Sequence, residues 1–187
     1  MLHEVMEMEF VEPIRNRKQI NDMKEFLLSR SERDYVMFTL GINSGLRISD
    51  LLSLTVDDVK DGKVTIKEQK TGKLKTFVLS DVCKTAIKDY LEHTGVTDYL
   101  FPSKKGSYIG RVQAWRIIQK AADYCGIKGR IGTHTLRKTF GYWAFKSGVD
   151  IYYIMKCLNH SSPAITKRYI GIEQDELDNI VYRKMNL

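Results

Sequence analysis

The sequence has few of the residues that build disulfide frameworks, zinc knuckles or membrane spans. Its 187 residues include only three cysteines, Cys83, Cys125 and Cys157, which are widely spaced and odd in number. No apolar run approaches the ~20 residues needed to cross a bilayer. Residues 1–15 carry acidic side chains where a secretory signal needs basic ones. We therefore expect a protein of the reducing cytoplasm that is not attached to a membrane.

The sequence also lacks the familiar motifs of metal and nucleotide chemistry. It has no paired-carboxylate metal site, no His-Glu-x-x-His pattern and no P-loop lysine motif. We therefore expect no cofactor and no bound metal, so any charge stabilisation falls to arginine, lysine and histidine side chains.

Acidic residues are scarce in the middle of the chain. The net charge is +7, but residues 102–170 alone carry thirteen Lys and Arg against two Asp. Residues 1–12 hold four Glu and no basic residue. A basic middle between acidic ends favours a polyanionic partner, most often nucleic acid, although a solvated basic surface would leave the same pattern. Charge does not distinguish DNA from RNA.

Hydrophobic periodicity predicts a mainly α protein with a small antiparallel β-sheet, an α+β fold. Residues 63–67 and 74–79 alternate as strands around a turn at 70–73, which makes a hairpin with a lysine-bearing tip. Helices are expected at 16–30, 31–44, 49–52, 80–93, 110–125, 134–147, 151–158, 163–169 and 174–185. Apolar stripes are expected on two of these: Val112, Trp115, Ile118 and Ala122 on the helix at 110–125, and Leu177, Ile180, Val181 and Tyr182 on the last. No composition shift marks a second domain, so residues 1–187 are interpreted as one domain with a lead-in at 1–15.

The chemistry-bearing residues concentrate between His134 and Tyr169. His134 and Arg137 lie three residues apart, so they share one face of a helix. His160 precedes Ser162, a plausible N-cap, and a helix N-terminus is a ready anion site. Each residue alone has an ordinary structural explanation, such as a helix-start histidine or one of ten tyrosines.

Two features outside this stretch are also suited to phosphate chemistry. Arg47 follows a glycine turn and offers a fork of donors that fits a phosphate, with Asp50 three residues on to hold it. Lys70 at the hairpin tip is a solvated turn lysine in most proteins, but there it can also donate a proton to a leaving oxygen.

Taken together, these residues resemble the catalytic domain of the tyrosine recombinases, the phage-integrase and Xer-type family. The resemblance covers roughly residues 10–187 and follows the family's order. Its motifs are the arginine box at 45–52, the lysine hairpin at 70–73, the His-x-x-Arg box at 134–137, and the closing boxes at 158–162 and 166–169. Three departures stand out: Asn159 replaces a usual glycine, Lys138 replaces a common histidine, and Pro163 starts the helix of the nucleophile.

The resemblance implies a site-specific recombinase or integrase of phage or mobile-element origin. Its six catalytic residues would be Arg47, Lys70, His134, Arg137, His160 and the nucleophile Tyr169. Tyr169 would attack a DNA phosphodiester to leave a 3′-phosphotyrosyl link while the two arginines clamp the phosphate. His134 would act as base, Lys70 as acid with Lys73 as a poorer substitute, and His160 would bond the phosphate while Asp50 orients Arg47. Further DNA contacts are expected from Lys73, Lys104, Lys105, Arg111, Lys138, Lys167 and Arg168.

The expected partner is double-stranded DNA, on which copies of the chain would associate, with a tetrameric synapse expected there and a monomer or weak oligomer in free solution. Many family members carry a helical clamp domain ahead of the catalytic one, and we expect none here. The chain is then either an excised fragment or a minimal member, as fimbrial phase-switch recombinases are. Residues 174–187 either pack on their own core or dock on a neighbouring protomer. Two alternatives remain open: a DNA-binding regulator without strand exchange, and a relaxing topoisomerase of the same chemistry.

Overall fold

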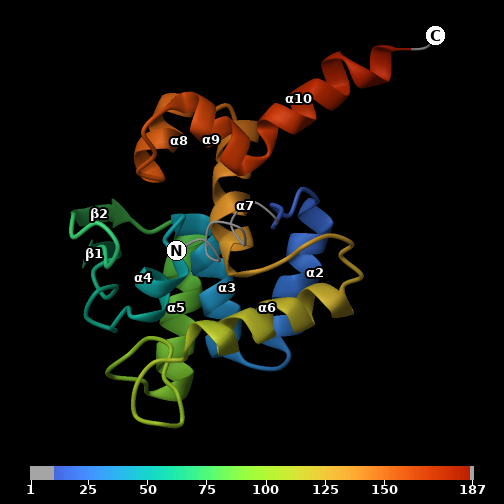
Figure 1. Cartoon of the computed structure of the whole chain (residues 1–187). Coiled ribbons are helices and arrows are strands. Elements are labelled where there is room, and N and C mark those ends of the chain that lie inside the picture. Colours follow the sequence, from blue (N-terminus) through green and yellow to red (C-terminus); the bar gives the residue numbers. More distant parts are fainter. Residues whose placement is uncertain (1–10, 186–187) are drawn as a thin grey trace.

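The computed structural model describes residues 11–185, and it is mainly helical with one small sheet, as predicted (Figure 1). The helices before the sheet are α2 (Arg17–Leu28), α3 (Glu32–Ser44) and α4 (Ile48–Leu52). The strands are β1 (Lys63–Lys67) and β2 (Leu74–Val78). The helices that follow are α5 (Asp81–Thr94), α6 (Arg111–Tyr124), α7 (Thr133–Lys146), α8 (Ile151–Cys157), α9 (Pro163–Ile170) and α10 (Ile172–Ile180), with a 3₁₀ turn η1 (Tyr182–Lys184).

The helix boundaries follow local capping chemistry. The side chain of Ser31 accepts a hydrogen bond from the Asp34 amide at 3.3 Å and opens α3. Asp150 caps α8 in the same way, and Ser162 caps α9, whose first residue is a proline. Gly45 ends α3 with a φ of 61°, a left-handed conformation that glycine adopts without strain. These starts and stops confirm the sequence predictions.

Three local predictions are wrong. The sequence predicts Ser49 as the N-cap of the short helix at 49–52, but α4 begins at Ile48 with Arg47 in the N-cap position, so Ser49 lies inside the helix. On α6, Ile118 and Ala122 are buried as predicted, but Val112 and Trp115 are exposed, and Ala114 and Ala121 face the core in their place. The helix expected at 174–185 breaks near Val181 into α10 and η1.

Helix α3 is the centre of the main core. It packs against α2, α5 and α7, and its residues Val36, Met37, Phe38 and Leu40 are almost fully buried. The segment before α2 joins the same body, since the Ile14 amide donates to Thr139 Oγ1 at 2.9 Å on α7. The predicted lead-in is therefore anchored from residue 11 onward, and its first ten residues lie outside the described part of the chain.

A second, smaller core joins α7 to α8 and α9. Its buried members are Tyr142, Ile154, Leu158, Ile170 and Ile172. Helix α7 therefore runs through both cores, with the α8–α9 unit packed around its C-terminal half (Figure 1). Gly141 allows this approach, because a Cβ there would lie 2.5 Å from Ile170 Cγ2.

The hairpin turns one side chain face toward the protein. In the antiparallel register Ile66 pairs with Lys75 and Val64 pairs with Phe77, and these four are the more buried positions of the two strands. Since side chains alternate along a strand, Glu68 continues the inward series of Val64 and Ile66 beyond the end of β1. The hairpin thus turns an acid and a lysine toward the body of the molecule.

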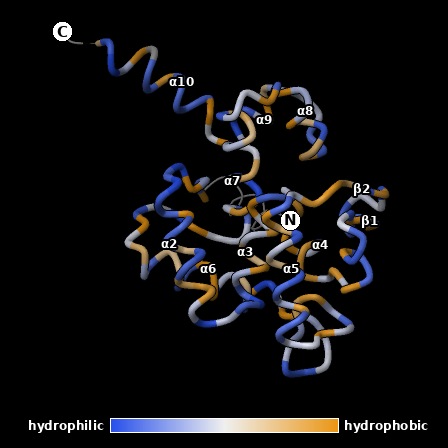
Figure 2. Tube along the Cα trace, turned by 180° about the vertical axis from the view of Figure 1, so that it is seen from behind, coloured by the Kyte–Doolittle hydropathy of each residue, from blue (hydrophilic) through white to orange (hydrophobic). Residues whose placement is uncertain are grey.

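The C-terminal helix leaves the body of the protein. Helix α10 extends away from the α8–α9 unit, with hydrophobic and hydrophilic positions interleaved along it (Figure 2). Leu177, Val181 and Tyr182 on the predicted apolar stripe are all exposed. Among residues 11–185, no helix has the length and apolar character that would let it cross a membrane.

Candidate active site

Arg137 lies at the junction of the two cores. It is on α7, only 4% exposed, and its guanidinium donates to the carbonyls of Gly45 and Leu158. One acceptor ends α3 and the other ends α8, so a single side chain joins both units. Burial and the nearby positive charge of Arg47 lower its pKa, while Tyr169, Glu68 and Asp50 act in the opposite direction. Arg137 was predicted from the sequence as a catalytic residue, but its bridging position was not.

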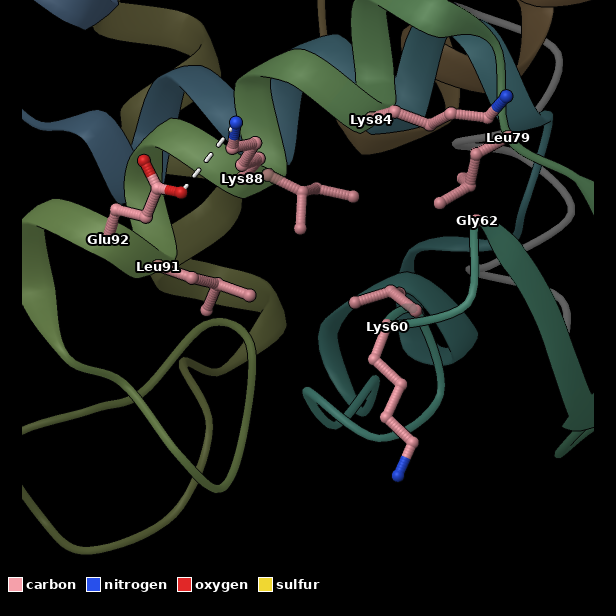
Figure 3. Close-up of a pocket in the computed structure, with 9 residues that line it drawn as sticks. Lys60, Gly62, Leu79, Lys84, Lys88, Leu91 and Glu92 are labelled. Carbon is pink, nitrogen blue, oxygen red and sulfur yellow. Dashed lines mark ion pairs between the residues drawn. The ribbon is translucent and has the colours of Figure 1, made fainter.

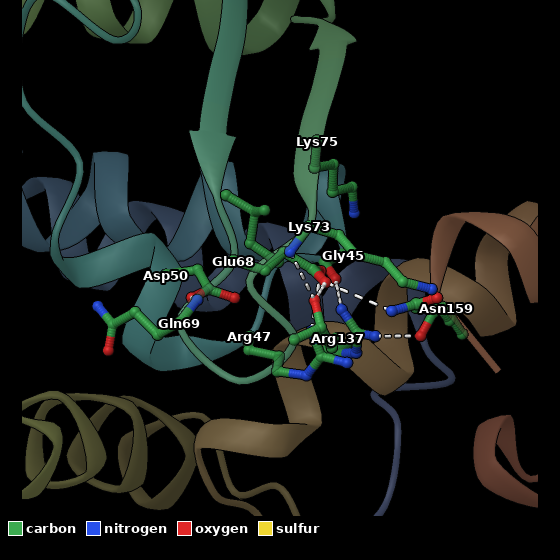
Figure 4. Close-up of polar contacts among 12 residues, drawn as sticks. Gly45, Arg47, Asp50, Glu68, Gln69, Lys73, Lys75, Arg137 and Asn159 are labelled. Atoms are coloured by element: carbon green, nitrogen blue, oxygen red, sulfur yellow. Dashed lines mark hydrogen bonds and ion pairs between the residues drawn. The ribbon is translucent and has the colours of Figure 1, made fainter.

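Arg47 approaches the same junction from the start of α4. Its Nη1 donates to Glu68 Oε1 at 2.8 Å, and the Glu68 side chain is only 3% exposed (Figure 4). Glu68 also accepts from Thr71 Oγ1 at 2.6 Å and from Asn159 Nδ2 at 3.4 Å. Burial raises the pKa of this carboxyl, but the hydrogen bonds and the positive charge of Arg47 outweigh it, and the pKa lies below its usual value.

Asp50, which we expected to orient Arg47, is occupied elsewhere. Its Oδ1 accepts a hydrogen bond from the Gln69 amide at 2.9 Å (Figure 4). The carboxylate that pairs with Arg47 belongs to Glu68. Asp50 therefore holds the turn after β1.

Tyr169 lies near the end of α9 with its hydroxyl buried. No hydrogen bond of standard geometry to that oxygen forms among the residues the structure describes, although the Arg137 guanidinium lies near enough to it to favour the ionised phenol. The ring meets the His160 ring edge-on at 4.9 Å between centroids, and Lys138 Nζ lies 5.1 Å from its centroid. Burial raises the pKa of the phenol, while the positive charges of Arg137 and Arg47 oppose that rise. The phenol and both arginines of one chain thus share one basin.

His160 completes the basin from the loop between α8 and α9. Its Nδ1 lies 3.2 Å from Thr166 Oγ1, and that hydroxyl donates to the Ser162 carbonyl at 3.0 Å. Burial and the positive charges of Arg137 and Arg47 lower the pKa of His160 to about 4. Its imidazole is therefore neutral at pH 7. The neighbouring Asn159 has a φ of 50°, the left-handed conformation in which a glycine would be at ease.

The residues expected to act as base and acid come from two different elements. His134 is partly buried on α7, one turn before Arg137. Lys70 is exposed on the turn that links β1 to β2, between residues that are both tied down by hydrogen bonds. The sequence analysis placed both residues on these elements.

Lys75 belongs to the basin but escaped the sequence analysis. Its Nζ donates to the Cys157 carbonyl at 2.9 Å, which ties β2 to the end of α8. Burial and the positive charge of Arg137 lower its pKa. Strand alternation carried the signal that would have found both Lys75 and Glu68, because each is a charged residue at an inward position.

The further DNA contacts predicted from sequence separate into three groups. Lys73, Lys104, Lys105 and Arg111 are exposed. Lys167 and Arg168 on α9 pair with Glu176 and Glu173 of α10, at 3.3 and 3.4 Å. Lys138 is 6% exposed and lies against the Tyr169 ring, so it differs from an open surface contact.

Residues 11–185 offer no metal cluster, and a pocket found in this part of the chain lies away from the basin. No group of three or more His, Cys, Asp or Glu residues within the described chain could hold a metal ion. A pocket of about 390 Å³ lies between α5 and the base of the hairpin, and its lining includes the apolar Leu79 and Leu91 together with Lys60, Lys84 and Lys88 (Figure 3). Its residues are separate from those of the basin.

The fold and this cluster of two arginines, histidines and a buried tyrosine define the class, the catalytic domain of the tyrosine recombinase type. The chain belongs to the phage integrase family, whose model matches residues 15–176. It is 45% identical over 170 residues to the probable integrase/recombinase YoeC of Bacillus subtilis (strain 168), which covers 90% of this chain and 93% of that protein.

Other relatives are longer than this chain. It is 34% identical over 157 residues to the tyrosine recombinase XerC of Caldanaerobacter subterraneus subsp. tengcongensis, across 80% of this chain but only 44% of that protein. The crystal structure of XerA recombinase matches with a TM-score of 0.77 at 23% identity, covering 94% of this chain and 66% of that one. The chain therefore spans about half to two thirds of these two proteins.

Proposed function

We propose that this chain is a site-specific DNA recombinase that cleaves and rejoins strands through a 3′-phosphotyrosyl intermediate. The observation that carries the proposal is the shared basin, in which a buried phenol and two arginines from distant parts of the sequence meet beside His160. Membership of the phage integrase family supports the same reaction. An origin in a phage or another mobile element fits both.

In this proposal, Arg47 and Arg137 bind the non-bridging oxygens of a DNA phosphate. Attack on phosphorus adds negative charge to those oxygens, and donors already fixed in place stabilise it without reorganising. Arg137 is fixed by two backbone carbonyls and Arg47 by Glu68. Neutral His160 adds a hydrogen bond to the phosphate, and Lys75 adds positive charge from the hairpin side.

The Tyr169 oxygen forms the new bond to phosphorus while the bond to the 5′ oxygen breaks. Burial raises the pKa of the phenol, so its proton must go to a base as the bond forms, and we assign that role to His134. Lys70 gives a proton to the departing 5′ oxygen. Rejoining runs these transfers in reverse, and the phosphotyrosyl bond retains the energy of the broken one, so no nucleotide cofactor is consumed.

The proposed partner is double-stranded DNA, gripped by exposed lysines and by Arg111, on which copies of the chain assemble into a synapse. Helix α10 is the candidate contact between copies, because its apolar residues Leu177 and Val181 are exposed in the single chain. In the single chain, Glu173 and Glu176 of α10 pair with Arg168 and Lys167 of α9. We propose that α10 docks on a neighbouring copy through its apolar residues, while these pairs hold its first turns to its own α9. A cytoplasmic location suits such an activity.

Covalent capture tests the proposal and identifies the target site in the same experiment. The protein is incubated with sheared genomic DNA of its source organism, denatured in SDS, and the attached fragments are sequenced. We expect adducts at one recurrent sequence, formed by the wild type and by the matched control Tyr153→Phe on exposed α8, but not by Tyr169→Phe.

Three other results would contradict parts of the proposal. Adducts with Tyr169→Phe would mean that another residue is the nucleophile. Adducts at unrelated sequences would indicate a relaxing topoisomerase. Salt-sensitive DNA binding without any adduct would leave only a DNA-binding regulator.

A further inference from the structure

The turn that carries Lys70 is tied to the protein on both sides of the lysine. Before it, the Gln69 amide donates to Asp50 Oδ1 at 2.9 Å, and the Gln69 side-chain amide donates to Ser53 Oγ at 3.1 Å. After it, the Thr71 hydroxyl donates to Glu68 Oε2 at 2.6 Å. An exposed tip of a two-stranded hairpin is ordinarily mobile, so these hydrogen bonds restrict where Lys70 can reach.

Glu68 is the element that connects this turn to the phosphate basin. One carboxylate oxygen pairs with Arg47 at 2.8 Å, and the other accepts from Thr71 and, at 3.4 Å, from Asn159 beside His160. Its backbone closes the turn as well, since the Glu68 amide donates to the Lys73 carbonyl at 2.9 Å and the Gly72 amide donates to the Glu68 carbonyl at 2.8 Å. A fully hydrogen-bonded buried charge fixes the geometry of its partners.

An acid at this position is otherwise hard to explain. A carboxylate beside Arg47 opposes the binding of an anionic phosphate, and an apolar residue would continue the inward series of Val64 and Ile66 without that penalty. Unlike an apolar residue, Glu68 accepts hydrogen bonds from both Arg47 and Thr71, and so links the arginine to the lysine-bearing turn.

We propose that Glu68 is a positioning residue for Lys70: through the Thr71 hydroxyl it holds the lysine-bearing turn in register with Arg47, so that the Lys70 ammonium reaches the departing 5′ oxygen. This inference rests on the proposed recombinase function. It predicts that Glu68 and Thr71 contribute to the proton transfer to the leaving group and that Thr71 does so without touching DNA phosphate or Arg47.

The test compares a substrate whose leaving group needs a proton from an acid with one whose leaving group needs none. Suicide substrates are built on the captured site, one with the natural 5′ bridging oxygen and one with sulfur there. A thiol has a pKa of ~8.5, so sulfur departs as thiolate and needs no proton. The ratio of sulfur to oxygen cleavage rates then reports the acid step alone, because phosphate binding and nucleophilic attack are common to both substrates.

Thr71→Val is the primary variant, since Thr71 is exposed and the change only replaces its hydroxyl with a methyl group, which removes the bond to Glu68 and the acceptor of the Lys73 amide at 3.3 Å. A general acid contributes ~10²–10⁴-fold, so we expect misplacing it to slow cleavage of the oxygen substrate by about 10- to 100-fold. The sulfur substrate should be cut at nearly the wild-type rate. Thr71→Ser restores the hydroxyl and should match the wild type on both, and Lys70→Ala should show the largest ratio.

Glu68→Ala tests the role of the Glu68 carboxylate directly. Because this change also disturbs Arg47, cleavage of both substrates should slow. The ratio of sulfur to oxygen cleavage rates should still rise as it does in Thr71→Val, and the double variant Glu68→Ala/Thr71→Val should raise that ratio no further. Glu68→Gln replaces it if the alanine variant does not fold.

Three results would overturn the inference while leaving the recombinase function intact. In the first, Thr71→Val would cleave the oxygen substrate at the wild-type rate, and in the second it would slow cleavage of both substrates equally. In the third, the double variant would raise the sulfur-to-oxygen rate ratio by the product of the two single effects. No sulfur rescue of Lys70→Ala would remove Lys70 as the acid, and the inference with it. A wild type that forms no adduct with either substrate refutes the proposed function itself.

Discussion

His160 makes the stability of this protein depend on pH in a direction that can be worked out. Its pKa falls from 6.5 to about 4 in the folded chain, because the ring is buried and faces the positive charges of Arg137 and Arg47. A histidine with a depressed folded pKa binds its proton more readily in the unfolded chain. Its contribution to stability is therefore complete above pH 6.5 and is lost as the pH falls toward 4.

The magnitude follows from the same two values. Each pH unit within the interval from 6.5 to about 4 corresponds to ~1.4 kcal/mol, so the loss between pH 7 and pH 4 is bounded at about 3 kcal/mol. The measured loss should fall below that bound, because the ring is partly exposed and solvent screens the arginine charges. Other groups titrate in the same interval, so the absolute stability curve is not diagnostic.

A matched variant isolates the histidine. His160→Asn places an amide where Nδ1 faces Thr166 and carries no titratable group. Urea unfolding of both proteins at half-unit steps from pH 7 to pH 4 gives two free energies of unfolding, and their difference cancels the other groups. We expect the wild type to lose about 2–3 kcal/mol relative to the variant across this range.

One result would refute the reasoning. If the difference between the two proteins stays constant from pH 7 to pH 4, then His160 does not face the two arginines in the folded chain. A wild type that gains stability relative to the variant as the pH falls would mean that an anionic group, and not Arg137, is the dominant neighbour. Either outcome removes the electrostatic basis of the basin.

Three further predictions follow from the packing of the same region. Tyr169→Phe should abolish the covalent adduct and change the free energy of unfolding by no more than ~1 kcal/mol, because the buried hydroxyl makes no hydrogen bond of standard geometry and loses only its interaction with nearby Arg137; SDS capture and urea unfolding measure the two effects, and a larger loss of stability would mean that Arg137 depends on the hydroxyl as an acceptor. Gly141→Ala should lower the free energy of unfolding by ~1–3 kcal/mol, since the new Cβ would lie 2.5 Å from Ile170, and unchanged stability would mean that α7 and α9 pack less closely. Arg137→Lys should slow adduct formation by ~10²–10³-fold and also destabilise the chain, because a lysine cannot bridge the two carbonyls; a stable but inactive variant would limit the arginine to a catalytic role.

The order of elements and the identity of most chemistry-bearing residues are written in the sequence. Side-chain caps such as Asp150 and Ser162, and the strand alternation before and after the turn at 70–73, depend on neighbours a few residues away. The prediction for the apolar face of α6 is right for Ile118 and Ala122 and wrong for Val112 and Trp115, because the hydrophobic period allows several rotations of a helix and only its packing partners select one.

The hydrogen-bond and ion-pair partners of the site residues could not be predicted from local sequence. Arg47 pairs with Glu68 rather than with nearby Asp50, and Arg137 finds its acceptors 92 and 21 residues away. Local sequence determined which helices, turns and reactive groups exist, because caps and alternation act over one or two turns of chain. Only the packing of α7 against both cores decided which charges meet, because burial and electrostatic pairing depend on distances in space that the order of residues does not record.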